Sequence, residues 1–561
     1  MEQFEGGTDR LGDPSIRRLD ALVIGMGFGG MCMLHSARAM GLDVLAIEAG
    51  SDVGGTWYWN QYPGARCDVI SIDYSYSFLD EIQQEWSWTE KFAAQPEILA
   101  YARFVAEKLD LRRSTVFGTR ATSIIFDDAR SVWTIKTDTK QRYEATYCIM
   151  ATGPLSIPKG VDIPGHERFR GEIHLTGRWP RHEVDFKGKR VGVIGTGSSG
   201  IQVIPVVAEL AEHLTVFQRT PSFTIPMRNK TLAPEYMAQV KANYPRLRTI
   251  ARSTHTGGVR PVSTRPLFSV PAEEAQRLME DAWAEGGQAM FGLFSDLLYD
   301  QATNDVVATF VRGKIGEMVK DPKTAEVLTP RGYPIFTRRP CLDTGYYETF
   351  NRDDVTLVDC INDPIEEITL EGVRTTSRDI PLDIIIAATG YDGLTGAMMA
   401  VDIKGRGGRS LREKWAGGAQ SYLGLMIEGF PNLFMIAGAN GPSALANFVI
   451  LNEDNVTWIL RCITHLQDRK FATIEPTIEA EQEYMELLTS IASRSLIPKA
   501  KSWYVGANIP GKANFFPIFA GGFSRYMEMC NSVASDDYRG FTFEPAGAEP
   551  SPRQSEARIA L

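Results

Sequence analysis

Two glycine clusters of identical spacing suggest that the chain binds two dinucleotides. Gly25-Met26-Gly27-Phe28-Gly29-Gly30 and Gly195-Thr196-Gly197-Ser198-Ser199-Gly200 both read GxGxxG, and an apolar run, residues 22–24 or 191–194, precedes each cluster. In such a strand–turn–helix unit the first glycine makes a tight turn, the second lets the backbone approach a pyrophosphate, and the third lets the helix pack closely. A chain with two such sites is suited to electron transfer between two bound nucleotides.

The residues that follow the next expected strands assign the two nucleotides. Residues 44–47 lead to Glu48, whose carboxylate can accept hydrogen bonds from ribose hydroxyls and would repel a 2′-phosphate, so the first site suits FAD or NAD. Residues 214–217 lead to Gln218, Arg219 and Thr220, where a guanidinium and a hydroxyl can meet a 2′-phosphate. The second site is therefore predicted to bind NADPH. The alternative is that Arg219 is a solvated arginine at a strand end.

Length, composition and charge favour an ordinary enzyme of several domains. The 561 residues predict two to four domains, and 43% hydrophobic residues suffice for their cores. A net charge of −10 argues against nucleic acid or an anionic membrane as a partner. The sequence begins without an apolar signal core and has no run of 18 apolar residues, so a cytoplasmic location is expected. Both a monomer and a homodimer are compatible with these features.

The cysteines argue against two other kinds of chemistry. The seven cysteines are scattered, with no CxxC pair and no paired histidine spacing for zinc. A flavoprotein that reduced disulfides would need a reactive cysteine pair beside the flavin. The sequence therefore predicts neither a disulfide reductase nor a metal site.

The order of motifs predicts an α/β fold with two Rossmann-like dinucleotide-binding domains and a helical insertion. Apolar strands end in two Ala-Thr-Gly turns, at 151–153 and 388–390, which bracket the second fingerprint and are candidate hinges. Between them, Val307, Phe310, Val311, Ile315 and Met318 recur at helical spacing. We expect disordered tails at 1–18 and 544–561, an FAD domain at 19–154 and 391–543, an NADP domain at 155–222 and 335–390, and a helical insertion at 223–334.

A longer motif connects the chain to a known family. Residues 54–68 fit GGxWxxxxYPGxxxD without a gap, from Gly54 to Asp68. Tyr346-Tyr347-Glu348-Thr349-Phe350-Asn351-Arg352-Asp353, after Arg338 and Arg339, and Ser502-Trp503-Tyr504 before residues 508–512 are further matches. On these residues the chain resembles the type I Baeyer–Villiger monooxygenases, from about residue 20 to residue 543.

The resemblance implies a reaction and its central residues. Members of this family use NADPH, O2 and FAD to convert a ketone to an ester or lactone through a C4a-peroxyflavin. Arg339 matches the active-site arginine, and a guanidinium stays protonated while it stabilises an anionic peroxide. Asp68 would orient Arg339 through charge-assisted hydrogen bonds. The plainer alternatives are a surface ion pair for the arginine and a turn-capping role for the aspartate.

The resemblance also implies which residues border the cofactors and the ketone. Ser443, Ala444, Leu445 and Phe448 would form the ketone pocket, and Trp503 would belong to a mobile loop that closes over the nicotinamide and excludes water. The full expected set of cofactor contacts is Gly25, Gly27, Gly30, Glu48, Thr56, Trp57, Tyr58, Trp59, Arg66, Cys67, Asp68, Tyr74, Ala121, Thr196, Gly197, Ser198, Ser199, Gly200, Gln202, Arg219, Thr220, Arg338, Phe448 and Trp503.

One signature position departs from the family pattern FxGxxxHxxxWP. Phe169, Gly171, Trp179 and Pro180 match, but Leu175 holds the histidine position and His174 lies one place early. On an extended segment a shift by one residue points the side chain to the opposite side. Either the backbone slips here, or the linker works without the imidazole; we favour the second. The departure bears on coupling between NADPH and product more than on reaction type.

Three other functions remain to be weighed. A flavin monooxygenase that oxygenates nitrogen or sulfur shares both fingerprints but does not need Arg339 or the Trp179-Pro180 ending. An NADPH oxidase that releases hydrogen peroxide is a second alternative, which the departure at Leu175 keeps open. A nucleotide-sensing binding protein would leave Arg339, Asp68 and the closing loop unexplained.

Overall fold

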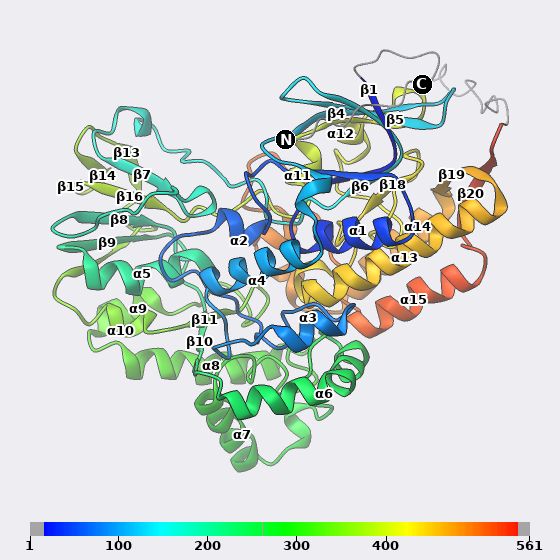
Figure 1. Cartoon of the computed structure of the whole chain (residues 1–561). Helices are drawn as coiled ribbons and strands as arrows, with labels where there is room; N and C mark the ends of the chain where they lie inside the picture. Colours follow the sequence, from blue (N-terminus) through cyan, green and yellow to red (C-terminus); the bar gives the residue numbers. More distant parts are fainter. Residues whose placement is uncertain (1–15, 261, 548–561) are drawn as a thin grey trace, which may run out of the picture.

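Two twisted sheets lie side by side, each flanked by helices, with a group of helices below them (Figure 1). The computed structural model describes residues 16–260 and 262–547. We call the sheet that contains the first fingerprint the first sheet, and the sheet that contains the second fingerprint the second sheet. The expected α/β fold with two dinucleotide-binding units is confirmed.

The first sheet is built from both ends of the described chain. β6 is central, because its first half pairs with β5 and its second half with β18, while β1 runs along its other side. Helix α1 (Phe28–Ala39) packs on this sheet after the first fingerprint. In spatial order the strands are β17 (Asp402–Lys404), β4 (Ala121–Asp127), β5 (Val132–Thr137), β6 (Arg142–Met150), β1 (Ile16–Ile24), β2 (Val44–Ile47) and β3 (Thr115–Val116), with β18 (Leu433–Met435) beside β6.

The second sheet is wholly parallel and is inserted in sequence between β6 and β17. Its three central strands are buried on both faces, as expected for a parallel sheet covered by helices such as α5 (Ser198–Leu210), whereas its two edge strands are partly exposed. A small antiparallel sheet, β13 (Ile365–Ile368), β14 (Gly372–Thr375) and β15 (Asp379–Pro381), adjoins it. The order is β12 (Val355–Asp359), β9 (His213–Gln218), β8 (Arg190–Ile194), β16 (Ile384–Ala387) and β7 (Glu172–Leu175).

The two Ala-Thr-Gly turns support the two fingerprints directly. Gly25 has φ +105°, and a Cβ there would lie 2.6 Å from the carbonyl oxygen of Ala151; Gly195 repeats this geometry against Ala388. A side chain at Gly30 would lie 1.8 Å from the carbonyl oxygen of Gly25. Only glycine allows these close approaches, so each fingerprint is packed against the turn at which the chain leaves its sheet.

The helical insertion begins and ends at one small parallel pair of strands. β10 (Thr224–Pro226) pairs with β11 (Cys341–Asp343), which brings both ends of the insertion together beside the second sheet. On α8 the expected buried face is confirmed at Val307, Val311 and Ile315. The insertion contains α6 (Pro234–Ser253), α7 (Ala272–Glu285), α8 (Gln301–Met318) and α9 (Pro322–Leu328).

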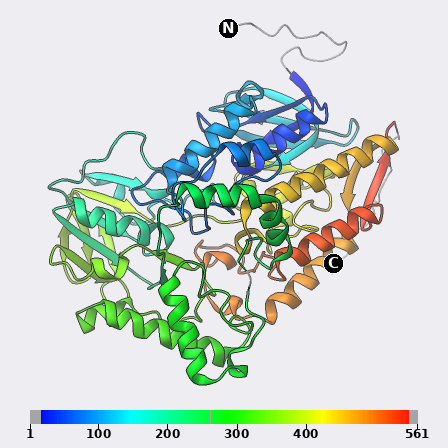
Figure 2. The same cartoon turned by 60° about the horizontal axis from the view of Figure 1, so that its bottom comes forward.

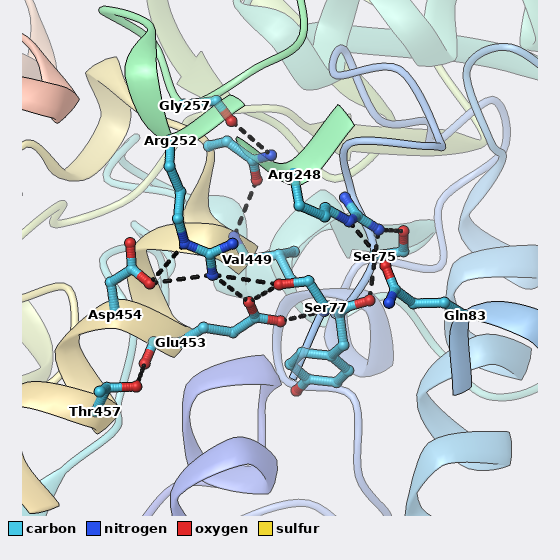
Figure 3. A network of polar contacts seen from close by, with 12 residues as sticks. Ser75, Ser77, Gln83, Arg248, Arg252, Gly257, Val449, Glu453, Asp454 and Thr457 are labelled. Carbon is cyan, nitrogen blue, oxygen red and sulfur yellow. Dashed lines mark hydrogen bonds and ion pairs between the residues drawn. The ribbon is translucent and has the colours of Figure 1, made fainter. Parts of the chain in front are cut away.

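A buried polar network fastens α6 to the lobe of the first sheet (Figure 3). Arg252 reaches Glu453 at 3.1 Å and Asp454 at 3.1 Å on α13 (Phe448–Arg469). Arg248 donates to the side chains of Gln83 and Ser75 and to the carbonyl of Ile72. Buried charges need such partners, so this network fixes the end of α6 and the loop that follows it.

The C-terminal part completes the lobe of the first sheet. Helix α13 packs on α1 and on α15 (Phe523–Ser535), and α14 (Ile478–Ser493) lies nearby; Figure 2 shows α13 and α15 side by side. β19 (Phe471–Pro476) pairs with β20 (Phe541–Pro545). The boundaries expected for disordered tails are therefore wrong at 16–18, which belong to β1, and at 544–545, which belong to β20, because both segments gain strand partners elsewhere in the chain. Residues 1–15 and 548–561 lie outside the described residues.

Candidate active site

A single large cavity of about 850 Å³ connects both fingerprints with the helical insertion. Its wall includes Gly25 and Gly27 from the first fingerprint, Ser198 from the second, and residues of the insertion such as His255 and Phe291. Parallel strands of both sheets end there, at β1 and β8, which is the usual place for ligands in such folds. The cavity therefore brings the first fingerprint, part of the second and the insertion to one shared space.

An arginine–aspartate pair stands in the wall of this cavity. The Nε of Arg339 donates to Oδ2 of Asp68 at 2.9 Å, and its Nη2 donates to Oδ1 at 2.6 Å. The third nitrogen, Nη1, donates to the carbonyl of Ala444 at 3.3 Å. This bidentate geometry fixes the plane of the guanidinium, because two parallel hydrogen bonds leave it little freedom to rotate.

The pair keeps its positive member charged. Burial alone would lower the pKa of Arg339, but the carboxylate of Asp68 outweighs it, and the pKa is raised. Arg339 remains 28% exposed, and this exposed part lies against the cavity. A charge that is held in place and partly open to the cavity can stabilise an anion there.

Glu48 lies where the first nucleotide is expected, but its contacts are more extensive than the sequence predicts. Its Oε2 accepts from the backbone N–H of Met26 at 2.7 Å, and its Oε1 accepts from that of Gly50 at 2.6 Å. Burial raises the pKa of this carboxyl, while the two N–H donors lower it. Glu48 therefore holds the fingerprint loop in place as well as facing the cavity.

Aromatic side chains from the long motif form one wall of the cavity. The Nε1 of Trp57 donates to the hydroxyl of Tyr74 at 3.0 Å, and the two rings meet edge to face. Trp57 lies on the short helix α2 (Thr56–Trp59). Tyr74 lies two residues after Ile72, whose carbonyl accepts a hydrogen bond from Arg248. The hydrogen bond locks both rings, which gives a flat ligand a rigid surface.

The residues expected to hold a 2′-phosphate lie together outside the cavity wall. Arg219 is exposed at the end of β9, and its charge contributes to lowering the pKa of Arg338, which burial lowers most. Arg338 stacks over the ring of Tyr333 at 4.1 Å and donates to the carbonyl of Lys501, while its buried Nε has no acceptor. Two neighbouring cations, one with an unused donor, suit a bound phosphate.

The structure brings most of the expected residues to the cavity, but not all of them. Residues that line it are Gly25, Gly27, Glu48, Thr56, Trp57, Trp59, Arg66, Cys67, Asp68, Tyr74, Ala121, Ser198, Gln202, Arg339, Ala444, Leu445, Phe448 and Trp503. Residues outside its wall are Gly30, Tyr58, Thr196, Gly197, Ser199, Gly200, Arg219, Thr220, Arg338 and Ser443. Gly30 and Gly200 instead pack against the fingerprint turns, as expected for the third glycine.

Ser443 differs from its expected role in the ketone pocket. It is fully buried, has φ +42°, and its hydroxyl has no hydrogen-bond partner. Its neighbours Ala444 and Leu445 line the cavity instead. The left-handed turn at Ser443 directs the next two residues to the cavity, a feature that sequence pattern does not reveal.

The backbone does not slip at the altered signature position. β7 pairs in continuous register with β16, from Glu172 opposite Ile384 to Leu175 opposite Ala387. His174 bonds Glu172 at 2.9 Å and packs against Trp179, and it does not line the cavity. Of the two readings of this segment, the structure therefore favours a linker that works without an imidazole.

Two titratable residues of the cavity wall carried no motif. Asp73 is 3% exposed; its Oδ2 accepts from the N–H of Val259, and its Oδ1 has no partner. Burial raises its pKa to about 6. His255 lies on the same loop as Val259, after α6, and burial lowers the pKa of its imidazole. Asp73 and His255 could be recognised only from the structure, in which residue 73 and the loop 255–259 lie together.

Residues 16–260 and 262–547 lack the groups that metal or disulfide chemistry would need. Those residues contain no cluster of metal-ligating side chains and no helix long and apolar enough to cross a membrane. The seven cysteines are all free. Burial raises the pKa of Cys67, which lies in the cavity wall, so it is not activated as a thiolate.

Curated relatives match the chain over nearly its whole length. It is 41% identical to a Baeyer–Villiger monooxygenase of Pseudooceanicola batsensis (92% of this chain, 95% of the relative) and 40% identical to a cyclohexanone 1,2-monooxygenase of an Acinetobacter species (94% and 96%). It is 39% identical to a phenazine N-monooxygenase of Lysobacter antibioticus (93% and 96%). A family model described as pyridine nucleotide-disulphide oxidoreductase matches residues 19–255.

Solved structures agree with the relatives. Oxidised steroid monooxygenase bound to NADP superposes with a TM-score of 0.90 at 45% identity, over 94% of this chain and 99% of that one. OTEMO in complex with FAD and NADP superposes with a TM-score of 0.91 at 38% identity, over 94% and 99%. With the fold, the paired fingerprints and the Arg339–Asp68 pair, these matches show that the chain belongs to the Baeyer–Villiger monooxygenase family of flavin enzymes.

Proposed function

We propose that the protein is an NADPH- and O2-dependent monooxygenase that inserts one oxygen atom beside the carbonyl of a ketone and forms an ester or lactone. FAD binds at the first fingerprint and NADPH at the second. The observation that carries the proposal is the bidentate Arg339–Asp68 pair in the wall of a cavity that both fingerprints share. Relatives and solved structures named for this chemistry support it.

The residues present fit the two cofactors. At the first fingerprint, Glu48 faces the cavity, and a Cβ at Gly55 would lie 2.8 Å from the Cα of Gly27, so bare backbone surrounds the expected pyrophosphate position. At the second, Arg219, Thr220 and the unused Nε of Arg338 would hold a 2′-phosphate. When bound, FAD supplies the activation of O2, and NADPH supplies the hydride.

Arg339 and Asp68 perform the part of the reaction that protein side chains can perform. The guanidinium stays charged at every working pH, so it can hold an anionic oxidant or a developing alkoxide without taking up or losing a proton. Asp68 accepts hydrogen bonds from Nε and Nη2 of Arg339, which leaves Nη1 directed toward the carbonyl of Ala444 and the cavity. Both residues therefore act by electrostatic stabilisation and orientation.

The loop of residues 503–512 restricts access of water to the guanidinium of Arg339. Trp503 lines the cavity and packs against Gly393, where a Cβ would lie 2.7 Å from the indole ring. Asn508 donates to the carbonyl of Tyr391, and Lys512 pairs with Asp392. These contacts hold the loop over the cavity, and exclusion of water strengthens the electrostatic effect of Arg339.

The proposal is tested by measuring ester or lactone, hydrogen peroxide and NADPH consumption together. Purified protein with bound FAD is offered cyclic, aryl and polycyclic ketones. About one ester or lactone per NADPH supports the proposal. Hydrogen peroxide equal to the NADPH consumed, with every ketone recovered unchanged, would instead identify an NADPH oxidase.

Oxygenation at nitrogen is the second candidate, because the phenazine N-monooxygenase is as similar as the ketone-oxidising relatives. The same panel therefore includes an aromatic N-heterocycle and a sulfide. Because these nucleophilic substrates require an electrophilic oxidant, they would not depend on Arg339 as a ketone does. N-oxide formation that survives substitution of Arg339 would favour this second function.

A further inference from the structure

Helix α2, which belongs to the long motif, also contacts the second lobe, the part of the protein built on the second sheet. In Figure 1, α2 lies between the first sheet and the second. Segment 56–66, which contains α2 and the loop after it, contacts two parts of the second lobe, residues 176–181 and α5, and also Tyr391, which directly follows the second Ala-Thr-Gly turn. How this segment is held therefore affects the position of one nucleotide site relative to the other.

Arg178 makes the first contact of segment 176–181. Its guanidinium carbon lies 4.2 Å from the ring centre of Trp59, and its Nη2 donates to the carbonyl of Ser156 at 2.9 Å. Burial lowers the pKa of this arginine, and it forms no ion pair with any residue that the structure describes. Its charge is therefore matched by an aromatic face and backbone carbonyls.

Arg181 makes the second contact, three residues later. Its guanidinium carbon lies 3.8 Å from the ring centre of Tyr58 and 5.5 Å from that of Trp59, and it donates to the carbonyl of Tyr58. Tyr58 and Trp59 stand edge to face with ring centres 4.9 Å apart. The two arginines therefore grip adjacent aromatic residues of α2.

Two hydrogen-bonded contacts complete the junction. Tyr62 donates to Oε1 of Gln202 on α5 at 2.8 Å, and the Nε2 of Gln202 donates to the carbonyl of Arg66 at 3.0 Å. Tyr391 donates to Oδ1 of Asn60. Neutral hydrogen bonds of this kind are individually weak, whereas the half-buried guanidinium of Arg178, stacked on an aromatic ring, adds a directional contact, and the exposed Arg181 adds a smaller one.

We propose that Arg178 and Arg181 are positioning residues that clamp the second lobe onto α2 and so keep the two nucleotide sites in register during turnover. Transfer of a hydride between two bound nucleotides requires close and fixed approach, and small displacements reduce it strongly. Residues 176–181 directly follow β7, where Leu175 stands in the signature position. Residues 176–181 thus contact α2 through two arginines, although the signature histidine is absent. The inference rests on the proposed function.

The test compares glutamine variants of both arginines, and a lysine variant of Arg178, in the FAD-loaded protein. Arg178→Gln, Arg181→Gln and the double variant remove the charge, whereas Arg178→Lys retains it without the planar stack. Arg312→Gln is the matched control, because Arg312 lies 5.6 Å from the ring of Phe223, away from α2. The measurements are the dissociation constant of NADP⁺, hydrogen–deuterium exchange of segment 56–66, and hydrogen peroxide formed per NADPH.

The double variant is expected to bind NADP⁺ about threefold to thirtyfold more weakly, the range expected for lost cation–π contacts. Segment 56–66 should exchange faster, and more NADPH should be consumed in the leak NADPH + H⁺ + O2 → NADP⁺ + H2O2. Arg178→Lys should fall between wild type and Arg178→Gln, and Arg312→Gln should match wild type in all three measurements.

Wild-type values of NADP⁺ binding, exchange and peroxide ratio in the double variant would overturn the proposal. If the double variant loses FAD or fails to fold, the exposed Arg181 alone decides, because Arg181→Gln removes a surface side chain. Binding and exchange need no ketone. A protein without ketone oxidation would thus contradict the proposed function and still leave the clamp measurable.

Discussion

Arg339 and Asp68, 271 positions apart in the chain, face each other through two hydrogen bonds of 2.9 and 2.6 Å. The aspartate ends the long motif after the first fingerprint, and the arginine lies two residues before β11, at the end of the helical insertion. Folding thus joins the two lobes at the point where the cavity receives its fixed positive charge.

Removing the charge of Arg339 should abolish ketone oxidation and spare the nucleotides. We expect Arg339→Ala to form ester or lactone at least about a hundredfold more slowly, because a preorganised cation in the cavity is lost. FAD content should remain at the wild-type level. Product and hydrogen peroxide are measured together, and unchanged ester formation in Arg339→Ala would refute the role given to this residue.

Substituting Asp68 by asparagine should misorient Arg339 without removing it. An asparagine amide presents an NH2 group to guanidinium donors, so one of the two hydrogen bonds becomes a repulsive contact. We expect kcat to fall about tenfold or more, with FAD retained and the KM for NADPH changed less. Asp68→Glu is the comparison, and equal kcat values for Asp68→Asn and wild type would show that orientation by Asp68 is unnecessary.

Arg219 should discriminate NADPH from NADH. Loss of one charge-assisted hydrogen bond to a 2′-phosphate raises the KM for NADPH about tenfold to a hundredfold in Arg219→Gln. The KM for NADH should stay the same, since NADH has no such phosphate. Arg170→Gln, another exposed arginine of this lobe, is the control. An equal effect on both coenzymes would assign Arg219 to general stability.

His174 should be dispensable for coupling. Its ring bonds Glu172 and packs on Trp179, outside the cavity wall. His174→Gln can keep a hydrogen bond to Glu172, so we expect the ratio of ester to NADPH to change less than about twofold. The ratio is measured at saturating ketone. A large rise in hydrogen peroxide would mean that this histidine, although displaced by one position, takes part in coupling.

Asp73 should make stability fall as pH rises through about 6. Burial raises its pKa from 3.8 to about 6 in the folded protein, so its stabilising contribution is present below pH 3.8 and is lost as pH increases through the folded value. The facing groups are Arg248, whose charge opposes the shift, and the N–H of Val259. The full difference is about 3 kcal/mol.

Asp73→Asn removes this titration and keeps an acceptor for Val259. Its melting temperature relative to wild type should therefore rise between about pH 4 and pH 8, because only the wild type becomes destabilised. Asp305→Asn, at an exposed position of α8, is the control and should show no such trend. A constant difference between Asp73→Asn and wild type would exclude a shifted pKa.

Local patterns predicted the nucleotide-binding units well. β2 spans Val44–Ile47, the expected apolar run, and both fingerprints lie between a buried strand and a helix. Glycine positions are informative because their backbone constraints are local: Gly25 and Gly195 both have φ +105°. The start of β1 at Ile16 was missed, since its pairing with Arg142 of β6 depends on a distant strand.

The remainder of the site depends on contacts between distant segments. Ser443 could not be distinguished from Ala444 by sequence, because a left-handed turn decides which residue reaches the cavity. Asp73 lacks a motif, and its burial results from the loop that follows α6. Arg178 occupies a variable place of the signature and Arg181 lies just after it, and their aromatic partners lie more than one hundred residues earlier.

The most direct test of the central claim is a single turnover mixture of protein, NADPH and an accepted ketone under ¹⁸O2. A Baeyer–Villiger reaction predicts one ¹⁸O atom in the ester or lactone and the other in water, and Arg339→Ala should lack the labelled product. An unlabelled ester would show that the inserted oxygen atom does not come from O2, and ¹⁸O found only in hydrogen peroxide would show that the protein does not oxygenate the ketone. Either result would contradict the function assigned to the Arg339–Asp68 pair.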